Sequence, residues 1–258
     1  MTTPSPAPRF LARLKSAERC LFGTWVKLPT HETLELIARA GFDYVAIDCE
    51  HAPLPLDVVY RLIAHAQALG MAALVRIPDQ ATNDYQRLLD AGADGLLVPR
   101  VRDRAEAANA VDRMRFSPLG QRGLGITSRA GAWGLMPLAD YVGGGNEDLL
   151  RCVQLEDRQV LENVEEVLDV PGLNAAFLGM GDLQLTTGLP ATHPDLQALV
   201  DKLLAACKAR GIPCGAAVQE PEAALAQARR GFRFVMVSND LTLFGKSFAA
   251  LGEKLRAG

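Results

Sequence analysis

Short apolar runs alternate with longer amphipathic segments along most of the chain. The apolar runs are rich in Val, Ile, Leu and Ala, and most are followed by a segment with helical spacing. This alternation is typical of βα units on a parallel sheet, and eight such units predict a closed (β/α)8 TIM barrel. The predicted strands cover residues 22–28, 44–50, 72–77, 95–100, 151–156, 175–179, 213–218 and 234–238.

Three similar stretches mark the joints between helices and strands: ARAGFDYVAID, LDAGADGLLVP and ARRGFRFVMVS. Each contains the end of a helix, a Gly suited to a left-handed C-cap, and the beginning of an apolar strand. The length of 258 residues is sufficient for one such barrel with a full core. Residues 1–258 are therefore predicted to form a single domain, in which residues 1–15 are a loose arm leading into a short helix.

Two segments depart from the alternation. The first, from Ser117 to Gly145, is rich in Gly and much longer than the roughly two to six residues usual in a βα loop. Such loops are usually functional or disordered. The second, residues 239–258, is predicted to form an amphipathic helix whose apolar face could pack on a partner. That face consists of Leu241, Phe244, Phe248 and Leu251.

The composition is that of an ordinary soluble globular protein, with 49% hydrophobic residues, 22% charged residues and a net charge of -3. No basic face indicates nucleic-acid binding. No apolar run approaches the roughly 18 residues of a membrane span, so we expect a cytoplasmic protein that does not bind membranes. The five cysteines are scattered without a CxxC pair, which favours reduced thiols.

Polar side chains gather where the predicted strands end. In a parallel barrel this edge carries the active site, because loops from all strands meet there. Acidic, cationic and imidazole groups are all present at these positions, which is unlike a random surface. The residues are Asp48, Glu50, His51, Arg76, Arg100, Gln154, Glu156, Asp157 and Asp182.

Glu156 and Asp182 follow neighbouring predicted strands. Two carboxylates aimed at one point repel each other unless a cation or a proton lies between them. Mg²⁺ and Mn²⁺ prefer oxygen ligands and often take only one or two carboxylates from the protein. The alternative is that each acid caps the following helix or pairs with an Arg.

Arg76, His51 and Asp90 each allow two interpretations. Arg76 at a strand tip suits either an anionic substrate or an ordinary surface position. His51, three residues after Asp48, is either a base oriented by that carboxylate or a loop residue bonded to backbone. Asp90, late in a helix, opposes the helix dipole, so another group is expected to hold it.

Other catalytic motifs are not found in the sequence. There is no zinc spacing, G-x-S-x-G, Walker A or G-x-G-x-x-G after a strand. The glycines of GMGDL either let backbone N–H groups approach an anion or only make a turn. We identify no lysine at a strand end in a position that suggests a Schiff base, which argues against class I aldolase chemistry.

Taken together, several stretches resemble the HpcH/HpaI aldolases over nearly the whole chain. The resemblance implies a class II, divalent-metal-dependent aldolase, a carbon-carbon lyase of the 4-hydroxy-2-oxoheptanedioate or 2-dehydro-3-deoxyglucarate aldolase type. Such an enzyme makes or cleaves 4-hydroxy-2-oxo acids through a metal-bound enolate, giving pyruvate or hydroxypyruvate and an aldehyde, in aromatic or sugar-acid catabolism. The matching stretches are GTWVKL, DYVAIDCEHAP, ALVRIP, LLDAGADGLLVPRV, SPLGQRGLG, RAGAWG, VQLE, FLGMGDL and FVMVSNDLTLF.

The resemblance also implies roles for individual residues. It makes Glu156 and Asp182 the ligands of Mg²⁺, Mn²⁺ or Co²⁺, and Arg76 the residue that binds the 2-oxo acid. It makes His51, with Asp48 as its partner, the group that handles protons. The remaining implied positions are Trp25, Gln154, Gly181 and Asp182 for substrate binding, and Asp90, which reaches the active site across a subunit contact.

Two departures from the family pattern are present. GMGDL replaces the usual GPADL but keeps the metal ligand, whereas DRQV after Glu156, with LTTG after the metal-site turn, changes the region that accepts the aldehyde and leaves its identity open. The alternative functions are oxaloacetate decarboxylase, another 2-oxo acid lyase of the same fold, and a non-catalytic barrel that binds a small acid. The resemblance further implies a homo-oligomer, expected to be a hexamer built as a trimer of dimers, with the C-terminal helix at a subunit interface.

Overall fold

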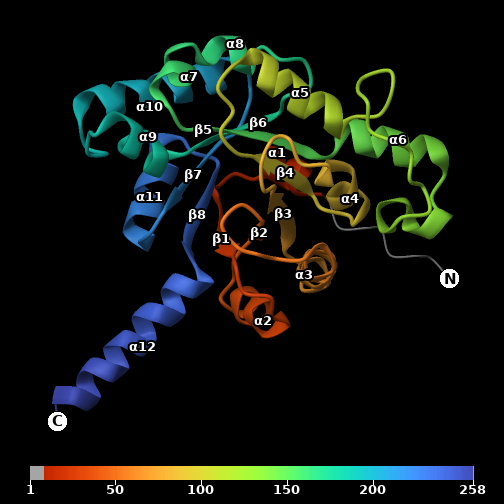
Figure 1. The fold of residues 1–258 in the computed structure, drawn as a ribbon. Coiled ribbons are helices and arrows are strands. Elements are labelled where there is room, and N and C mark those ends of the chain that lie inside the picture. The colour runs from red at the N-terminus through yellow and green to blue at the C-terminus, as the bar shows by residue number, and fades with distance from the viewer. Residues whose placement is uncertain (1–8, 258) are drawn as a thin grey trace.

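The structure is a computed structural model that describes residues 9–257. Residues 1–8 of the predicted arm lie outside the described residues, and the short helix expected after them is α1 (Phe10–Ser16). Eight parallel strands pair in sequence order into a closed barrel, which confirms the predicted TIM-barrel fold (Figure 1). The strands are β1 (Leu21–Val26), β2 (Tyr44–Asp48), β3 (Ala72–Arg76), β4 (Gly95–Val98), β5 (Leu150–Leu155), β6 (Ala175–Leu178), β7 (Cys214–Val218) and β8 (Phe234–Asn239).

Helices surround the barrel and follow every strand (Figure 1). Most present an apolar stripe to the strands and a polar face to solvent, as amphipathic helices do. No helix among residues 9–257 combines the length and apolarity needed to cross a membrane. The helices after α1 are α2 (His31–Arg39), α3 (Leu56–Ala68), α4 (Asp84–Asp90), α5 (Arg104–Met114), α6 (Leu138–Glu147), α7 (Arg158–Glu162), α8 (Val164–Leu168), α9 (Met180–Thr187), α10 (Pro194–Ala209), α11 (Pro221–Arg230) and α12 (Asp240–Ala257).

The inside of the barrel is filled by side chains, and α1 covers the end at which the strands begin. Phe10 of α1 is fully buried, and its ring lies 4.8 Å from that of Tyr44 and 6.0 Å from that of Phe234. Tyr44 and Phe234 are the first residues of β2 and β8, so this apolar cluster closes the amino end of the barrel. This closure leaves the carboxyl end as the side from which the interior of the barrel can be reached.

The segment from Ser117 to Gly145 contains more regular structure than a loop. It includes a 3-10 helix, η1 (Arg129–Gly134), and most of α6. The run of glycines concealed α6 from sequence analysis, because Gly weakens a helix in isolation. Packing explains Gly145, since a Cβ there would lie 2.4 Å from the ring of Phe116.

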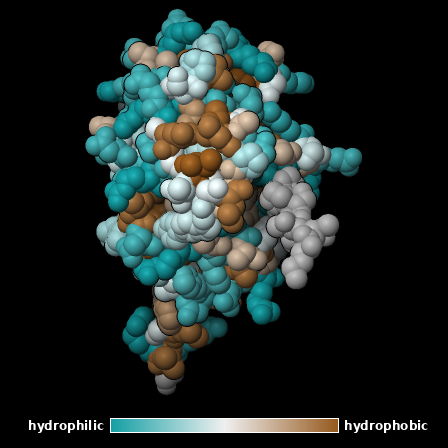
Figure 2. Space-filling model, turned by 90° about the vertical axis from the view of Figure 1, so that its right-hand side faces the viewer, coloured by the Kyte–Doolittle hydropathy of each residue, from teal (hydrophilic) through white to brown (hydrophobic). Residues whose placement is uncertain are grey.

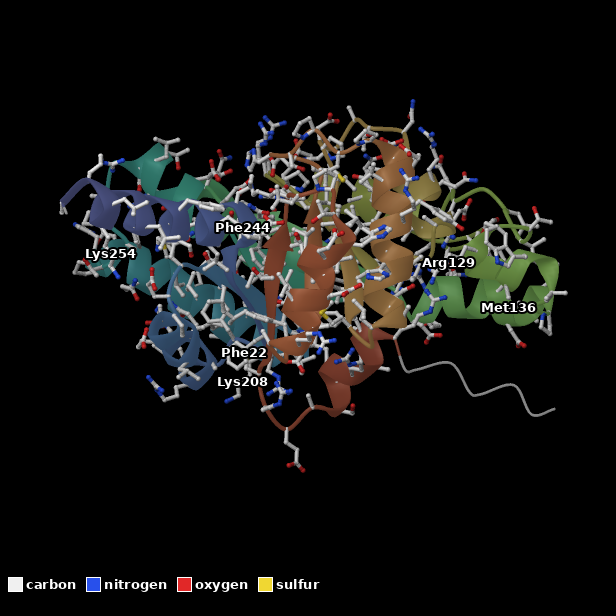
Figure 3. The ribbon with its side chains drawn as sticks, turned by 90° about the horizontal axis from the view of Figure 1, so that it is seen from below. Phe22, Arg129, Met136, Lys208, Phe244 and Lys254 are labelled. Atoms are coloured by element: carbon white, nitrogen blue, oxygen red, sulfur yellow. The ribbon has the colours of Figure 1, made fainter. Side chains whose placement is uncertain are left out.

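Two apolar surfaces lie on opposite sides of the barrel. The first comprises the exposed Leu119, Leu124, Trp133, Leu135 and Leu138, on a side where Figure 2 shows apolar side chains gathered. The second is α12, which confirms the predicted C-terminal helix and projects away from the barrel (Figure 1). Figure 3 shows Phe244 and Lys254 of α12 on one side and Arg129 and Met136 on the other. The exposed apolar residues of α12 are Leu241, Leu243, Phe244, Phe248, Leu251 and Leu255.

Candidate active site

The register between β2 and β3 places Asp48 directly beside Arg76. Asp48 is 0% exposed and receives two parallel hydrogen bonds from Arg76, from Nε at 2.9 Å and from Nη2 at 2.8 Å. Burial would raise the pKa of Asp48, but the hydrogen bonds and charges of Arg76 and Lys27 outweigh burial and lower the pKa to about 2. Asp48 is therefore a permanent anion that fixes the guanidinium.

Arg76 is also held from two other sides. Its Nη1 lies 3.0 Å from Oε2 of Glu50, and its guanidinium carbon lies 4.2 Å from the centre of the Trp25 ring. The side chain is only 8% exposed. An arginine fixed by two carboxylates and an aromatic face loses little freedom when it binds an anion, which suits it to recognise a carboxylate.

The sequence assigns no specific role to Glu50, but the structure places it at the centre of the site. Its carboxylate contacts Arg76 and also Arg100, whose Nη2 is 2.9 Å and whose Nε is 3.1 Å from Oε1. The side chain of Glu50 is buried although it belongs to a loop after β2. Its position after a predicted strand indicated that it lies at the site, but spacing alone did not reveal its two arginine partners.

Lys27 is a further residue of the site, which the sequence analysis did not single out. It follows β1 directly, and its Nζ lies 2.8 Å from Oδ2 of Asp48. Its backbone N–H and that of Leu28 both donate to the buried carboxylate of Asp240, the first residue of α12. Because the ammonium group is engaged in an ion pair, it is not available as a nucleophile, and the argument against Schiff-base chemistry remains.

Five side chains form one continuous series of ion pairs across the ends of four strands, β1 to β4. In order they are Lys27, Asp48, Arg76, Glu50 and Arg100, so three cations alternate with two carboxylates and the series carries a net charge of +1. We call it the ion-pair chain. Without its two terminal cations, the central trio would carry a net charge of -1 and would repel an anionic substrate.

A second group of carboxyls lies beside the ion-pair chain. Burial raises the pKa of Glu156 to about 7, and the nearby charges of Asp182 and Glu50 add to the effect. Glu156 is buried at the end of β5, whereas Asp182 is exposed in the first turn of α9. A bound cation would stabilise the charged form of Glu156 beside a second carboxylate.

The surroundings of Glu156 fit a hard divalent ion. Gln154 donates Nε2–H to Oε2 of Glu156, while its own Oε1 is buried without a partner among the described residues. A Cβ at Gly179 would lie 2.5 Å from the Glu156 side chain, whereas one at Gly181 would meet nothing within 4 Å. Oxygen donors and open space at Gly181 suit Mg²⁺ or Mn²⁺ with further ligands from water or substrate. Within residues 9–257, no group of three or more His, Cys, Asp or Glu is arranged to hold a metal.

His51 lies at the same edge, but the predicted pair with Asp48 is not formed as expected. Asp48 accepts from the backbone N–H of His51 at 3.2 Å, not from its imidazole. The ring is 55% exposed, and its Nε2 lies 3.7 Å from Oε2 of Glu50. The physical reason is that Arg76 and Lys27 occupy the Asp48 oxygens, so Glu50 is the carboxylate that faces the imidazole.

Asp90 is not brought to this site within one chain. It ends α4, at the end of the barrel where the next strand begins, and its Oδ1 lies 2.7 Å from Nη2 of Arg122 and 3.2 Å from the hydroxyl of Tyr141. These contacts supply the partners that its position late in a helix predicted. Its role at a neighbouring subunit's site stays a prediction.

Comparisons with known proteins identify the family of the sequence. The sequence model of the HpcH/HpaI aldolase/citrate lyase family matches residues 21–246. A 2-dehydro-3,6-dideoxy-6-sulfogluconate aldolase of Pseudomonas putida is 33% identical over 227 residues, 86% of this chain and 87% of the relative. A 5-keto-4-deoxy-D-glucarate aldolase of Salmonella paratyphi A is 32% identical over 250 residues, 96% of each chain.

A solved structure extends the comparison to three dimensions. A protein of the HpcH/HpaI aldolase/citrate lyase family from Burkholderia cenocepacia superposes with a TM-score of 0.86 at 30% identity. The similarity covers 95% of this chain and 98% of that one, so the whole barrel is shared.

Proposed function

This chain belongs to the HpcH/HpaI aldolase/citrate lyase family, and we propose that it is a divalent-metal-dependent aldolase of 4-hydroxy-2-oxo acids, with pyruvate or hydroxypyruvate as one product. Its relatives are named aldolases, which are carbon-carbon lyases. The observation that carries the proposal is Arg76, an immobilised guanidinium held by Asp48 and Glu50, together with the buried Glu156, on which the charges of Asp182 and Glu50 act. A 2-oxo acid needs both a cation for its carboxylate and stabilisation of its carbonyl oxygen.

In the cleavage direction, Arg76 holds the carboxylate of the 2-oxo acid. A base removes the proton of the C4 hydroxyl, the C3–C4 bond breaks, and its electron pair forms the enolate of pyruvate while the aldehyde leaves. His51 is the proposed base, because its exposed imidazole lies at the rim and faces Glu50. The enolate then takes up a proton at C3 to give pyruvate, so atoms and charges balance.

The carboxyls of Glu156 and Asp182 would hold the divalent ion, with Gln154 orienting Glu156. When bound, such an ion supplies Lewis-acid stabilisation of the negative charge that develops on the 2-oxo oxygen. Trp25 forms a flat wall against Arg76, and the backbone at Gly181 offers open space for the substrate carboxylate. These residues therefore suit a small, planar, anionic acid.

The proposal is tested by turnover of aldol adducts made from pyruvate or hydroxypyruvate and a panel of aldehydes. With Mg²⁺, Mn²⁺ or Co²⁺ we expect release of pyruvate or hydroxypyruvate, according to the adduct, measured by reduction with lactate dehydrogenase and NADH. Release should be lost completely in EDTA and recover after excess metal is added. Equal turnover in EDTA would contradict metal dependence. No release from any adduct with any of the three metals would contradict the aldolase function.

We also propose that the chain assembles into a homo-oligomer, most simply a hexamer built as a trimer of dimers. Two separate apolar surfaces, on α12 and on the segment from Leu119 to Leu138, provide the two kinds of contact that such symmetry requires. A contact at the segment from Leu119 to Leu138 would bring Asp90, which contacts Arg122 of that segment, toward a neighbouring subunit, as its proposed role requires.

Replacing Phe248 with Asp should reduce the mass measured by light scattering, because a charge in the centre of the α12 face opposes its burial. Lys254→Asp, a surface change on the same helix, serves as the control for altered charge. An active monomer of the unmodified chain at assay concentration would contradict the proposed assembly.

A further inference from the structure

Arg100 has an unusual backbone conformation for a residue with a long side chain. Its φ of 54° lies in the left-handed region, which costs a non-Gly residue roughly 1 kcal/mol or more. The backbone N–H of the next residue, Val101, donates to the carbonyl oxygen of Gln154 at 3.2 Å, two residues before Glu156, one of the two proposed metal ligands. The conformation therefore fixes Arg100 immediately beside the reacting centre.

The guanidinium of Arg100 is only partly neutralised. It contacts Glu50 through Nε and Nη2, but Glu50 shares its single charge with Arg76, whose Nη1 is 3.0 Å away. No acceptor among residues 9–257 contacts Nη1 of Arg100, and the side chain is 64% exposed. Arg100 is thus the solvent-facing end of the ion-pair chain and keeps hydrogen-bond donors free for an additional anion.

The direction of substrate access makes this position important. Side chains and α1 close the amino end of the barrel, so an aldehyde reaches the pocket only through the carboxyl end. Arg76 lies deeper, 8% exposed, and Arg100 lies outside it. The second substrate therefore meets Arg100 on the solvent side of the bound 2-oxo acid.

We propose that Arg100 is a specificity-determining residue that selects aldehydes carrying a negatively charged group. This inference rests on the proposed function and deepens it by naming the chemical class of the aldehyde. The shared feature is an anionic substituent, a carboxylate or a phosphate, that forms a charge-assisted hydrogen bond with the free side of the guanidinium. Glu50 holds the side chain in place for that contact.

The experiment compares matched aldehydes in the aldol direction with pyruvate and Mn²⁺. Succinic semialdehyde is paired with butanal, and glyceraldehyde 3-phosphate is paired with glyceraldehyde, so that each pair differs mainly in its charge. In Arg100→Met the ratio of kcat/KM for the charged aldehyde to that for the neutral one should fall about 10- to 100-fold, the size expected for a charge-assisted hydrogen bond. The pair with the larger fall identifies the preferred anion.

Three further variants separate charge from backbone strain and from general electrostatics. Arg100→Gly removes the strain together with the charge and should give the same fall, whereas Arg100→Lys should retain much of the preference. Arg102→Met removes a charge from the same loop, where Arg102 pairs with Glu106, and should leave the ratio within about 2-fold.

The outcomes distinguish this inference from the proposed function. Solvent exchange of the methyl protons of pyruvate needs no aldehyde and reports the proposed function alone. The inference would be overturned if the unmodified enzyme catalyses both proton exchange and aldol formation while Arg100→Met and Arg100→Gly show the same ratio of kcat/KM values as the unmodified enzyme. If the unmodified enzyme catalyses neither proton exchange nor aldol formation, the proposed function and this inference are both overturned.

Discussion

Replacing Glu156 with Gln should reduce aldol turnover by about 10³-fold or more and remove most of the affinity for Mn²⁺. Gln keeps the size of the side chain but removes the negative charge that the metal requires, and catalysis depends on charge stabilisation at this point. Metal affinity is measured by isothermal titration calorimetry, and turnover by pyruvate release. Full activity of Glu156→Gln in chelator-treated buffer would show that the metal site lies elsewhere.

The same variant has an expected effect on stability that depends on pH. The folded-state pKa of Glu156, about 7, lies above its ordinary value, so ionisation of Glu156 destabilises the fold progressively as the pH rises toward 7. Gln cannot ionise. Metal-free Glu156→Gln should therefore melt at an equal or higher temperature than the unmodified protein at pH 8, which would establish that lost activity is not lost folding.

Asp157→Asn provides a matched control for the loss of a carboxylate. Asp157 is the next residue, and its side chain accepts from the backbone N–H of Val160 as the N-cap of α7. Asn is an equally good N-cap, so folding and turnover should both be retained. A loss of activity in Asp157→Asn similar to that in Glu156→Gln would mean that the local negative charge, not the position of Glu156, is required.

Replacing Arg76 with Met should weaken every reaction of pyruvate by roughly 10²- to 10⁴-fold, including exchange of its methyl protons with solvent. The variant also leaves Asp48 buried without its principal partner, which costs about 3 to 5 kcal/mol. Arg76→Lys is therefore needed as a second variant, because it keeps a charge but cannot form the parallel pair of hydrogen bonds. Proton exchange is followed by NMR in D₂O.

His51→Ala should impair a different step of the reaction from the Arg76 variants. If His51 transfers the hydroxyl proton, its loss should lower kcat for cleavage about 10²- to 10⁴-fold, with a smaller effect on pyruvate exchange and affinity. The exposed ring makes little contribution to packing, so folding should be unaffected. Equal loss of pyruvate affinity in His51→Ala and Arg76→Lys, with cleavage surviving in His51→Ala, would assign the base to another residue.

The barrel was predictable because its signals are local. Strands buried on both faces are continuous apolar runs, and the Gly residues that end the helices stand at fixed places before them. The helix α6 was not predictable in this way, because its glycines oppose helix formation locally. Gly145 belongs in a helix only because Phe116, far away in the sequence, needs the space.

The candidate site was predictable in its members more than in its contacts. The positions of Arg76, Glu156 and Asp182 followed from the ends of strands. The partners of Asp48 did not, because they depend on the register of β2 with β3 and on a lysine from β1. Arg76 and Lys27 compete with the imidazole of His51 for the carboxylate of Asp48. Spacing along the chain contains no information about that competition.

The closure of the barrel by α1 has a kinetic consequence. With Phe10 packed against Tyr44 and Phe234, both substrates and both products must pass through one opening. In the proposed function, the 2-oxo acid that Arg76 holds lies deeper in that passage than the aldehyde. Turnover should therefore be sequentially ordered, with the aldehyde leaving first in cleavage and binding last in synthesis, so that pyruvate competes with the aldol adduct and the aldehyde does not.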